Sequence, residues 1–121
     1  MQYACLIYYD PKSLFGGGAE AQSVLDECES HDEKLQESGH FVNSVALVMP
    51  DEAMTVHVRD GRMSAVDGPF METKEMLGGL VVIEARDLNE AVRVASAMPH
   101  ARIGYVEVRP LIDFGSERPQ L

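Results

Sequence analysis

The chain has 121 residues, of which 45% are apolar, and a formal net charge of −10. This length fits a single domain with a core of its own. The excess of carboxylates repels phosphate backbones and no lysine or arginine cluster offsets it, so we expect no direct contact with nucleic acid. No apolar run reaches the roughly 18 residues of a membrane span, and the first residues are strand-like and lack the basic and then apolar pattern of a signal peptide. We therefore expect a soluble, cytoplasmic protein with no membrane partner.

Residues 2–9 are apolar on both alternating faces, which is typical of a central strand that is covered on both sides. Asp10 and Pro11 are predicted to end this strand. Residues 12–18 contain three consecutive glycines and predict a flexible loop, without the spacing of a phosphate-binding loop. An ordinary surface loop and a mobile lid near a pocket both fit this composition.

Apolar residues recur with a helical period between Glu20 and Ser38, and Gly39 is a helix stop signal. His31 falls inside the apolar stripe, which consists of Ala21, Val24, Leu25, Cys28 and Leu35. The pattern therefore directs His31 toward the sheet, where a structural and a catalytic histidine are both consistent with it. Cys5 and Cys28 lack metal-type spacing and are predicted to be buried free thiols.

A second group of strands is predicted over residues 42–48, 55–59 and 62–66, and Asp60-Gly61 is a strong signal for a hairpin turn between the last two. His57 alternates with valines and is expected on the exposed face of this hairpin. The run DGPFMETKE at 67–75 then predicts a tight turn followed by a polar segment, since Gly68 tolerates positive φ and Pro69 fixes its own φ. We expect Phe70 to anchor this loop on an apolar surface.

Residues 79–85 predict another strand, and Asp87 with Glu90 has the pattern of a helix N-cap. The helix that follows is expected to end at Pro99 and to bury one face, made of Leu88, Ala91, Val92, Ala95 and Met98. Residues 104–109 form the last predicted strand. The order β-α-β, hairpin, β-α-β indicates a four-stranded antiparallel sheet with both helices on one face.

The two late strands carry different side chains on their two faces. One set is purely apolar, and the other is mixed, consisting of Leu80, Val82, Glu84, Tyr105, Glu107 and Arg109. If the apolar set packs under the helices, the mixed set covers the second face of the sheet. A partner subunit closing over that face would form a half-polar chamber, so we expect a homodimer whose sheets face each other; a solvated outer face is the alternative.

The run at 67–75, followed by Leu77-Gly78-Gly79, resembles the signature of the DGPF group within the YCII-related family of small bacterial proteins. Residues 3–9 and 106–110 are similar to the first and last strands of that family. The resemblance covers residues 1–112, the expected single domain, and leaves 113–121 as a flexible polar tail. It implies an α+β, ferredoxin-like fold that pairs into a dimeric barrel, and it implies no settled reaction.

A proposed catalytic histidine of YCII-related proteins lies on the first helix, and residues 31–35 of this chain are similar to that segment. The resemblance therefore implies that His31 is a catalytic acid/base. The aspartate that those proteins place just before the last strand has no counterpart, because this chain reads Ala97-Met98-Pro99-His100-Ala101 at that place.

Six further residues are candidates for contact with a small organic ligand: Tyr8, Asp67, Phe70, Lys74, Glu107 and Arg109. Asp67 and Lys74 could equally belong to a turn that only holds the shape of the loop. The histidines at 31, 40, 57 and 100 have no paired spacing, so we expect no metal site, and no motif indicates a cofactor.

Two functions of different classes fit these features. The first is binding of a small molecule, with cofactor-independent acid/base catalysis by His31 in a pocket of the dimer. The second is a non-catalytic ligand-sensing or regulatory module. Similar proteins are often encoded beside sigma factors of the extracytoplasmic-function type, and an acidic surface suits a basic protein partner.

Overall fold

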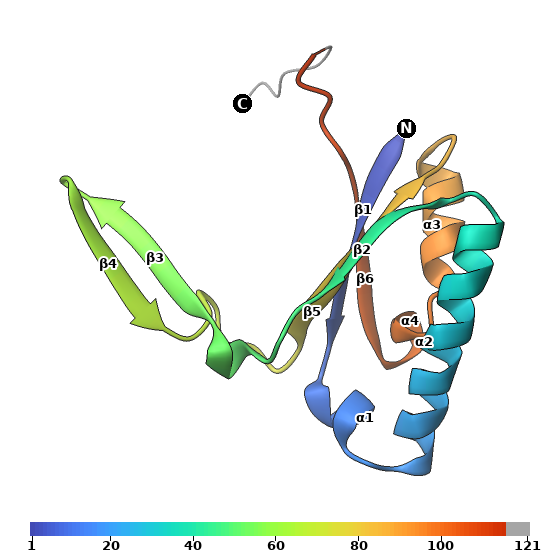
Figure 1. Cartoon of the computed structure of the whole chain (residues 1–121), viewed down its shortest axis with the longest axis horizontal. Helices are drawn as coiled ribbons and strands as arrows, with labels where there is room; N and C mark the ends of the chain where they lie inside the picture. Colours follow the sequence, from blue (N-terminus) through green and yellow to red (C-terminus); the bar gives the residue numbers. More distant parts are fainter. Residues whose placement is uncertain (116–121) are drawn as a thin grey trace.

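The computed structural model describes residues 1–115. Four α-helices, one 3-10 turn and six strands follow one another in these residues (Figure 1): β1 (Gln2–Tyr9), α1 (Pro11–Phe15), α2 (Ala19–Glu37), β2 (Phe41–Ala46), η1 (Pro50–Glu52), β3 (Met54–Arg59), β4 (Arg62–Asp67), β5 (Met76–Glu84), α3 (Leu88–Ser96), α4 (His100–Ile103) and β6 (Gly104–Pro110). None of the helices in residues 1–115 is both long enough and apolar enough to cross a bilayer.

Four strands form the main sheet in the order β2-β5-β1-β6, and each neighbouring pair is antiparallel. Helices α2 and α3 lie on the same side of this sheet (Figure 1). The predicted antiparallel sheet with helices on one face is thus confirmed. Strands β3 and β4 form a separate two-stranded sheet, which projects from the domain on the side away from the helices.

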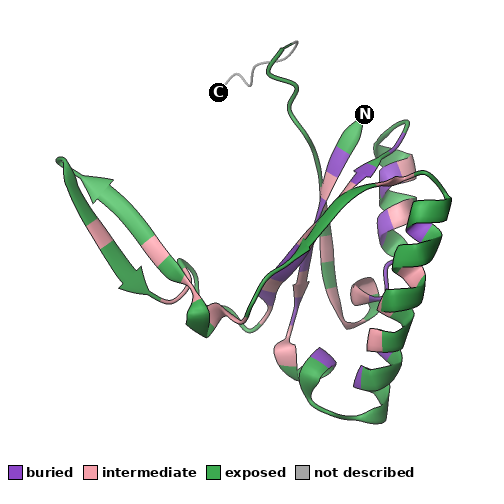
Figure 2. Cartoon of the chain, viewed as in Figure 1, coloured by how far each residue is buried: buried purple, intermediate pink, exposed green. Residues whose placement is uncertain are grey.

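The core lies between the sheet and the two long helices. Every second residue of β1 and β5 contributes to it, and α2 and α3 cover these residues. Among its most deeply buried members are Tyr3, Cys5, Val24, Ile83 and Ala91. Figure 2 shows this buried layer along the inner strands and the inner sides of the helices. The core therefore depends on the period of two in the strands and the period of 3.6 in the helices.

The opposite face of the main sheet is uncovered in the described chain. Strand β1 turns Leu6 and Tyr8 to this face and β5 turns Leu80 and Val82 to it, all of them only half-buried. The side chain of Tyr105 on β6 is 67% exposed. The predicted division of the strands into an apolar and a mixed face is confirmed, and we call this second surface the open face.

The segment after β1 differs from the predicted flexible loop over residues 12–18. Residues 11–15 form helix α1, because Asp10 Oδ1 accepts a hydrogen bond from the backbone of Lys12 at 3.0 Å and Pro11 occupies the first turn. Leu14 is only 3% exposed and joins the core. The loop is therefore limited to Gly16, Gly17 and Gly18.

The hairpin of β3 and β4 has the predicted turn, with Asp60 at φ 54° and Gly61 at φ 74°. His57 is exposed, as predicted. The other face is apolar but is not covered either: Val56 is 60% exposed and Val58 is 55% exposed. An isolated two-stranded sheet without a covered face is only marginally stable in water.

Helix α3 begins with the predicted cap, in which Asp87 Oδ1 accepts a hydrogen bond from Glu90 N at 2.8 Å. The buried face of this helix is narrower than predicted. Leu88 and Val92, which were expected to be buried, are about half exposed over a shallow groove beside β6. The helix ends at Ser96, and the short helix α4 precedes β6. Of the predicted tail, residues 113–115 are described and contain a turn, while 116–121 lie outside the described residues.

Candidate functional site

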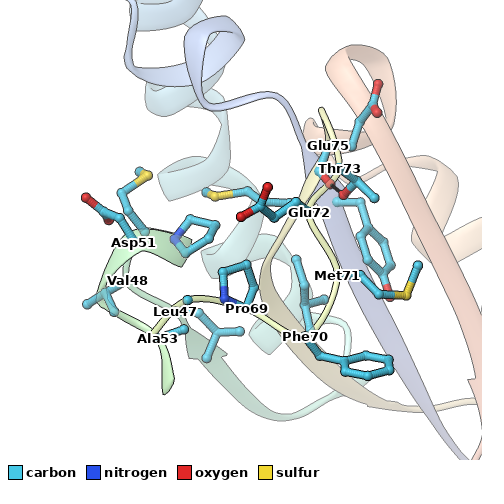
Figure 3. Close-up of a pocket in the computed structure, with 16 residues that line it drawn as sticks. Leu47, Val48, Asp51, Ala53, Pro69, Phe70, Met71, Glu72, Thr73 and Glu75 are labelled. Carbon is cyan, nitrogen blue, oxygen red and sulfur yellow. Dashed lines mark hydrogen bonds between the residues drawn. The ribbon is translucent and has the colours of Figure 1, made fainter. Parts of the chain in front are cut away.

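A cavity of about 870 Å³ lies where the hairpin leaves the main sheet. Figure 3 shows Leu47, Val48, Asp51 and Ala53 on one side of it, and Phe70, Met71, Thr73 and Glu75 on the other, with Pro69 and Glu72 between. We call this cavity the loop pocket. Its size is within the roughly 300–1,000 Å³ of small-molecule sites.

Local backbone contacts hold the loop that forms one wall. Gly68 has φ +102°, a conformation that residues with a side chain rarely adopt, and its N–H donates to Ala53 O at 2.7 Å. Thr55 Oγ1 donates to Gly68 O at 2.9 Å. The loop is therefore tied to the start of β3, which brings it opposite the β2–β3 connection.

The lining of the loop pocket is mainly apolar, with Tyr8 from β1 and Leu77 from β5 at its sheet end. Three carboxylates also line it, from Asp51, Glu72 and Glu75, and no lysine, arginine or histidine does so in the described chain. Phe70 is 85% exposed, so the expectation that it anchors the loop is wrong. Its ring instead borders the pocket, because the turn at Gly68-Pro69 directs the chain away from the core.

The predicted ligand residues fall into three places. Tyr8 and Phe70 line the loop pocket. Asp67 at the end of β4 and Lys74 on the loop after it are exposed, and neither lines the loop pocket. Glu107 and Arg109 lie on the open face of β6, where Arg109 Nε is 3.8 Å from Glu107 Oε2. The loop pocket therefore contains only two of these six residues, Tyr8 and Phe70.

His31 lies in a different and much smaller cavity, between α2, the core side of the sheet and the segment before α4. The cavity volume is about 20 Å³, which is room for about one water molecule. His31 Nε2 is buried and has no hydrogen-bond partner in the described chain. Burial lowers the pKa of His31, opposed by the nearby carboxylate of Asp32, so the imidazole is favoured in its neutral form.

His100 joins this cavity, although its position in the sequence gave no reason to expect it there. Its Nε2 lies 3.4 Å from Cys28 Sγ, and its ring centroid lies 5.9 Å from that of Tyr9. Burial lowers the pKa of His100. Burial, with a smaller contribution from the negative charge of Asp32, raises the pKa of Cys28 to about 11. Both groups are therefore neutral near pH 7, so a thiol donating to an imidazole is favoured over a thiolate–imidazolium pair.

The two cysteines are free, as predicted, but only Cys5 is buried; Cys28 is half-buried beside His100. The main sheet lies between His31 and the open-face residues, so the predicted site is divided between two sides of the sheet. Within residues 1–115, no group of three histidine, cysteine or acidic side chains has an arrangement that could hold a metal ion.

A four-stranded antiparallel sheet with helices on one face, an open second face and a small-molecule-sized pocket define this chain as an α+β, ferredoxin-like protein. More narrowly, it belongs to the YCII-related domain family, which it matches over residues 1–115. It is 33% identical over 114 residues to an uncharacterized protein of Rhizobium meliloti (strain 1021), with 92% of each chain covered.

Among solved structures, the fold is similar to that of the 5-chloro-2-hydroxyhydroquinone dehydrochlorinase of Burkholderia phenoliruptrix AC1100, in complex with 2,5-dihydroxybenzoquinone. The TM-score is 0.53 at 15% sequence identity, and the match covers 98% of this chain and 100% of the other. The likeness at this identity concerns the fold.

Proposed function

We propose that this protein binds a small organic molecule in the loop pocket. The observation that carries the proposal is a mainly apolar cavity of about 870 Å³. A folded monomer has no stability gain from keeping Phe70 and Met71 in water, whereas a bound molecule would cover both. The sequence signature at 67–75, which we assign to the DGPF group, builds this wall.

The first compounds to test are ring compounds that carry oxygen or nitrogen substituents. The dehydrochlorinase with a similar fold is in complex with a dihydroxybenzoquinone, which supports including quinones and phenols. A thermal-shift screen suits a domain of this size, because a ligand at 100 times its Kd raises the free energy of unfolding by about 2.7 kcal/mol. We expect at least one compound to raise the melting temperature.

A pair of variants tests the location. Phe70→Ala removes an 85% exposed ring from the pocket, and Phe114→Ala removes a 71% exposed ring outside it. Both should leave stability nearly unchanged, because neither ring is in the core. We expect Phe70→Ala alone to weaken binding of a hit. No hit at all, or equal losses in both variants, would exclude the loop pocket as the binding site.

Acid/base catalysis by His31 is a second candidate function. It is supported by the buried, unpartnered Nε2 and by the lowered pKa, because a neutral imidazole can accept a proton at pH 7. The single-water size of its cavity requires the segment at Pro99-His100 to move before a substrate reaches Nε2. Unchanged turnover of a hit by a folded His31→Gln variant would exclude this role.

We also propose that the chain forms a homodimer with facing sheets, a dimeric barrel. Two uncovered surfaces of the described chain support it: the mixed open face and the apolar hairpin face that carries Val56, Val58 and Met63. The hairpin projects on the side of the open face (Figure 1), so one symmetric pairing could cover both. The hairpin of β3 and β4 contains two arginines and two aspartates, Asp60 and Asp67, so its formal net charge is zero. A dimer contact made by the hairpin therefore avoids the charge repulsion between two acidic subunits.

Light scattering tests the dimer against a chain mass of 13.3 kDa. Val56→Lys places a charge on the apolar face of the hairpin, and His57→Lys places the same charge on its polar face. We expect the first variant to shift the mass toward the monomer and the second to leave it dimeric. A monomeric wild-type protein at micromolar concentration would contradict the proposal.

The regulatory alternative, in which the chain contacts an extracytoplasmic-function sigma factor, is supported by the acidic charge alone. Co-purification from the native host at low salt tests it. If a sigma factor is retained on the tagged protein and released by salt, the regulatory function replaces the enzymatic one; if none is retained, the alternative is rejected.

A further inference from the structure

We infer that the ligand of the loop pocket is a hydrophobic cation, such as an aromatic or alkyl amine, and that organic anions are excluded. This inference rests on the proposed small-molecule function and adds the charge of the ligand to it. It is carried by the composition of the pocket wall, in which every charged side chain is a carboxylate.

The three carboxylates come from separate parts of the chain and lie on different sides of the cavity. Asp51 belongs to η1 on one wall, whereas Glu72 and Glu75 belong to the loop that forms the other (Figure 3). None of the three is in an ion pair within residues 1–115. Lys74 is exposed and does not line the pocket. A ligand in the cavity therefore meets negative charge without a compensating cation in the lining.

The uncharged part of the lining favours the same ligand. Tyr8 and Phe70 provide aromatic rings, whose faces attract cations within about 6 Å. Met49, Met71 and Met76 contribute polarizable thioethers, which fit apolar groups of varied shape. An amine with an apolar body can place its ammonium group beside one of these carboxylates and its body on the apolar side chains, whereas the carboxylates repel an anion of the same shape.

The charge of the whole chain acts in the same direction. A net charge of −10 raises the local concentration of cations and lowers that of anions around the protein. This long-range effect is screened by salt over about 8–10 Å, whereas contacts inside a partly enclosed pocket are screened less. Salt dependence and matched variants can therefore separate the pocket from the general surface charge.

The test measures the Kd of three compounds with nearly the same skeleton: phenethylamine, phenethyl alcohol and hydrocinnamate. Isothermal titration calorimetry at low and physiological salt gives each affinity. We expect the amine to bind on the order of tenfold more tightly than the alcohol, and the anion to bind most weakly. Equal or tighter binding of the alcohol or the anion overturns the cation inference while leaving a small-molecule site in place.

Two double variants localise the effect. Glu72→Gln with Glu75→Gln removes two pocket charges, and Glu29→Gln with Glu33→Gln removes two exposed charges of α2. We expect only the first pair to reduce amine affinity by several fold and to raise the relative affinity of hydrocinnamate. Equal losses in both pairs would assign the preference to overall charge and refute the pocket assignment. If none of the three compounds binds, the cation inference is rejected, whereas the proposed pocket function is rejected only if the thermal-shift screen also gives no hit.

Discussion

Gly104 at the start of β6 provides a sharp test of the packing of the main sheet. It pairs with Tyr9 of β1, and a Cβ at this position would lie 2.0 Å from Tyr8 O and 2.9 Å from Tyr9 Cα. Both neighbours are backbone atoms, so no side-chain rotation can relieve the clash. Gly104→Ala must therefore separate β6 from β1 at this pair, and overpacking of this kind costs about 2–3 kcal/mol.

The expected loss corresponds to a drop in melting temperature of about 8–12 °C, since a chain of 121 residues loses about 4 °C per kcal/mol. Thermal unfolding followed by circular dichroism measures it. Gly18→Ser is the matched control, because a Cβ at Gly18 meets nothing within 4 Å and serine is a favourable N-cap for α2. A Gly104→Ala melting temperature within 2 °C of the wild type, on the scale of about 4 °C per kcal/mol, would refute this placement of β6 against β1.

Three further predictions use the same unfolding assay or simple chemistry. Asp87→Ala removes the acceptor of the 2.8 Å cap of α3 and should cost about 1 kcal/mol, whereas Asp87→Asn should retain most of it. Burial lowers the folded-state pKa of His31 and His100 below the value of an unfolded histidine, so protonation favours unfolding. The free energy of unfolding should therefore be full above the unfolded pKa of about 6.5 and should fall as the pH drops below it. The fall should be smaller in the His31→Gln, His100→Gln double variant, and an equal fall in the variant and the wild type would contradict this account. Because burial raises the pKa of Cys5 and Cys28 to about 11, alkylation by iodoacetamide at pH 7.5 should be slow until urea unfolds the chain, and rapid alkylation of the folded protein would contradict the raised pKa of the thiols.

Local signals in the sequence predicted the elements that depend on near neighbours. The turn at Asp60-Gly61 needs only positive φ at two positions, and the cap at Asp87 needs only a donor three residues later. The alternation in residues 79–85 likewise predicted which face of β5 enters the core, because the pleat of a strand fixes it.

The predictions that failed concern where an apolar side chain finds a partner. Helix α1 was missed because the glycines that follow it dominated the composition, whereas the burial of Leu14 stabilises it. Phe70 was expected to be an anchor, yet its burial depends on the position of a distant surface. Leu88 and Val92 have the helical period of a buried face, but they lie beside β6, the edge strand of the main sheet, and remain about half exposed.

The candidate site shows the same limit. The sequence indicated Tyr8 and Phe70 as ligand residues, and both line the loop pocket. It contained no signal for Asp51, which belongs to a separate turn. It also directed His31 to the core side of the sheet without indicating that the open-face candidates lie on the other side.

By itself, the sequence determined the order of the strands and long helices, their caps and turns, the faces of the sheet and the excess of negative charge, since these depend on residues within about four positions or on composition alone. Only the tertiary structure decided which cavities exist and what lines them. Cys28 and His100 are 72 positions apart and meet at 3.4 Å. The loop pocket similarly requires β1, η1 and the loop after β4 to converge. Such contacts are selected by packing of the whole chain, because no local interaction distinguishes them before the sheet has formed.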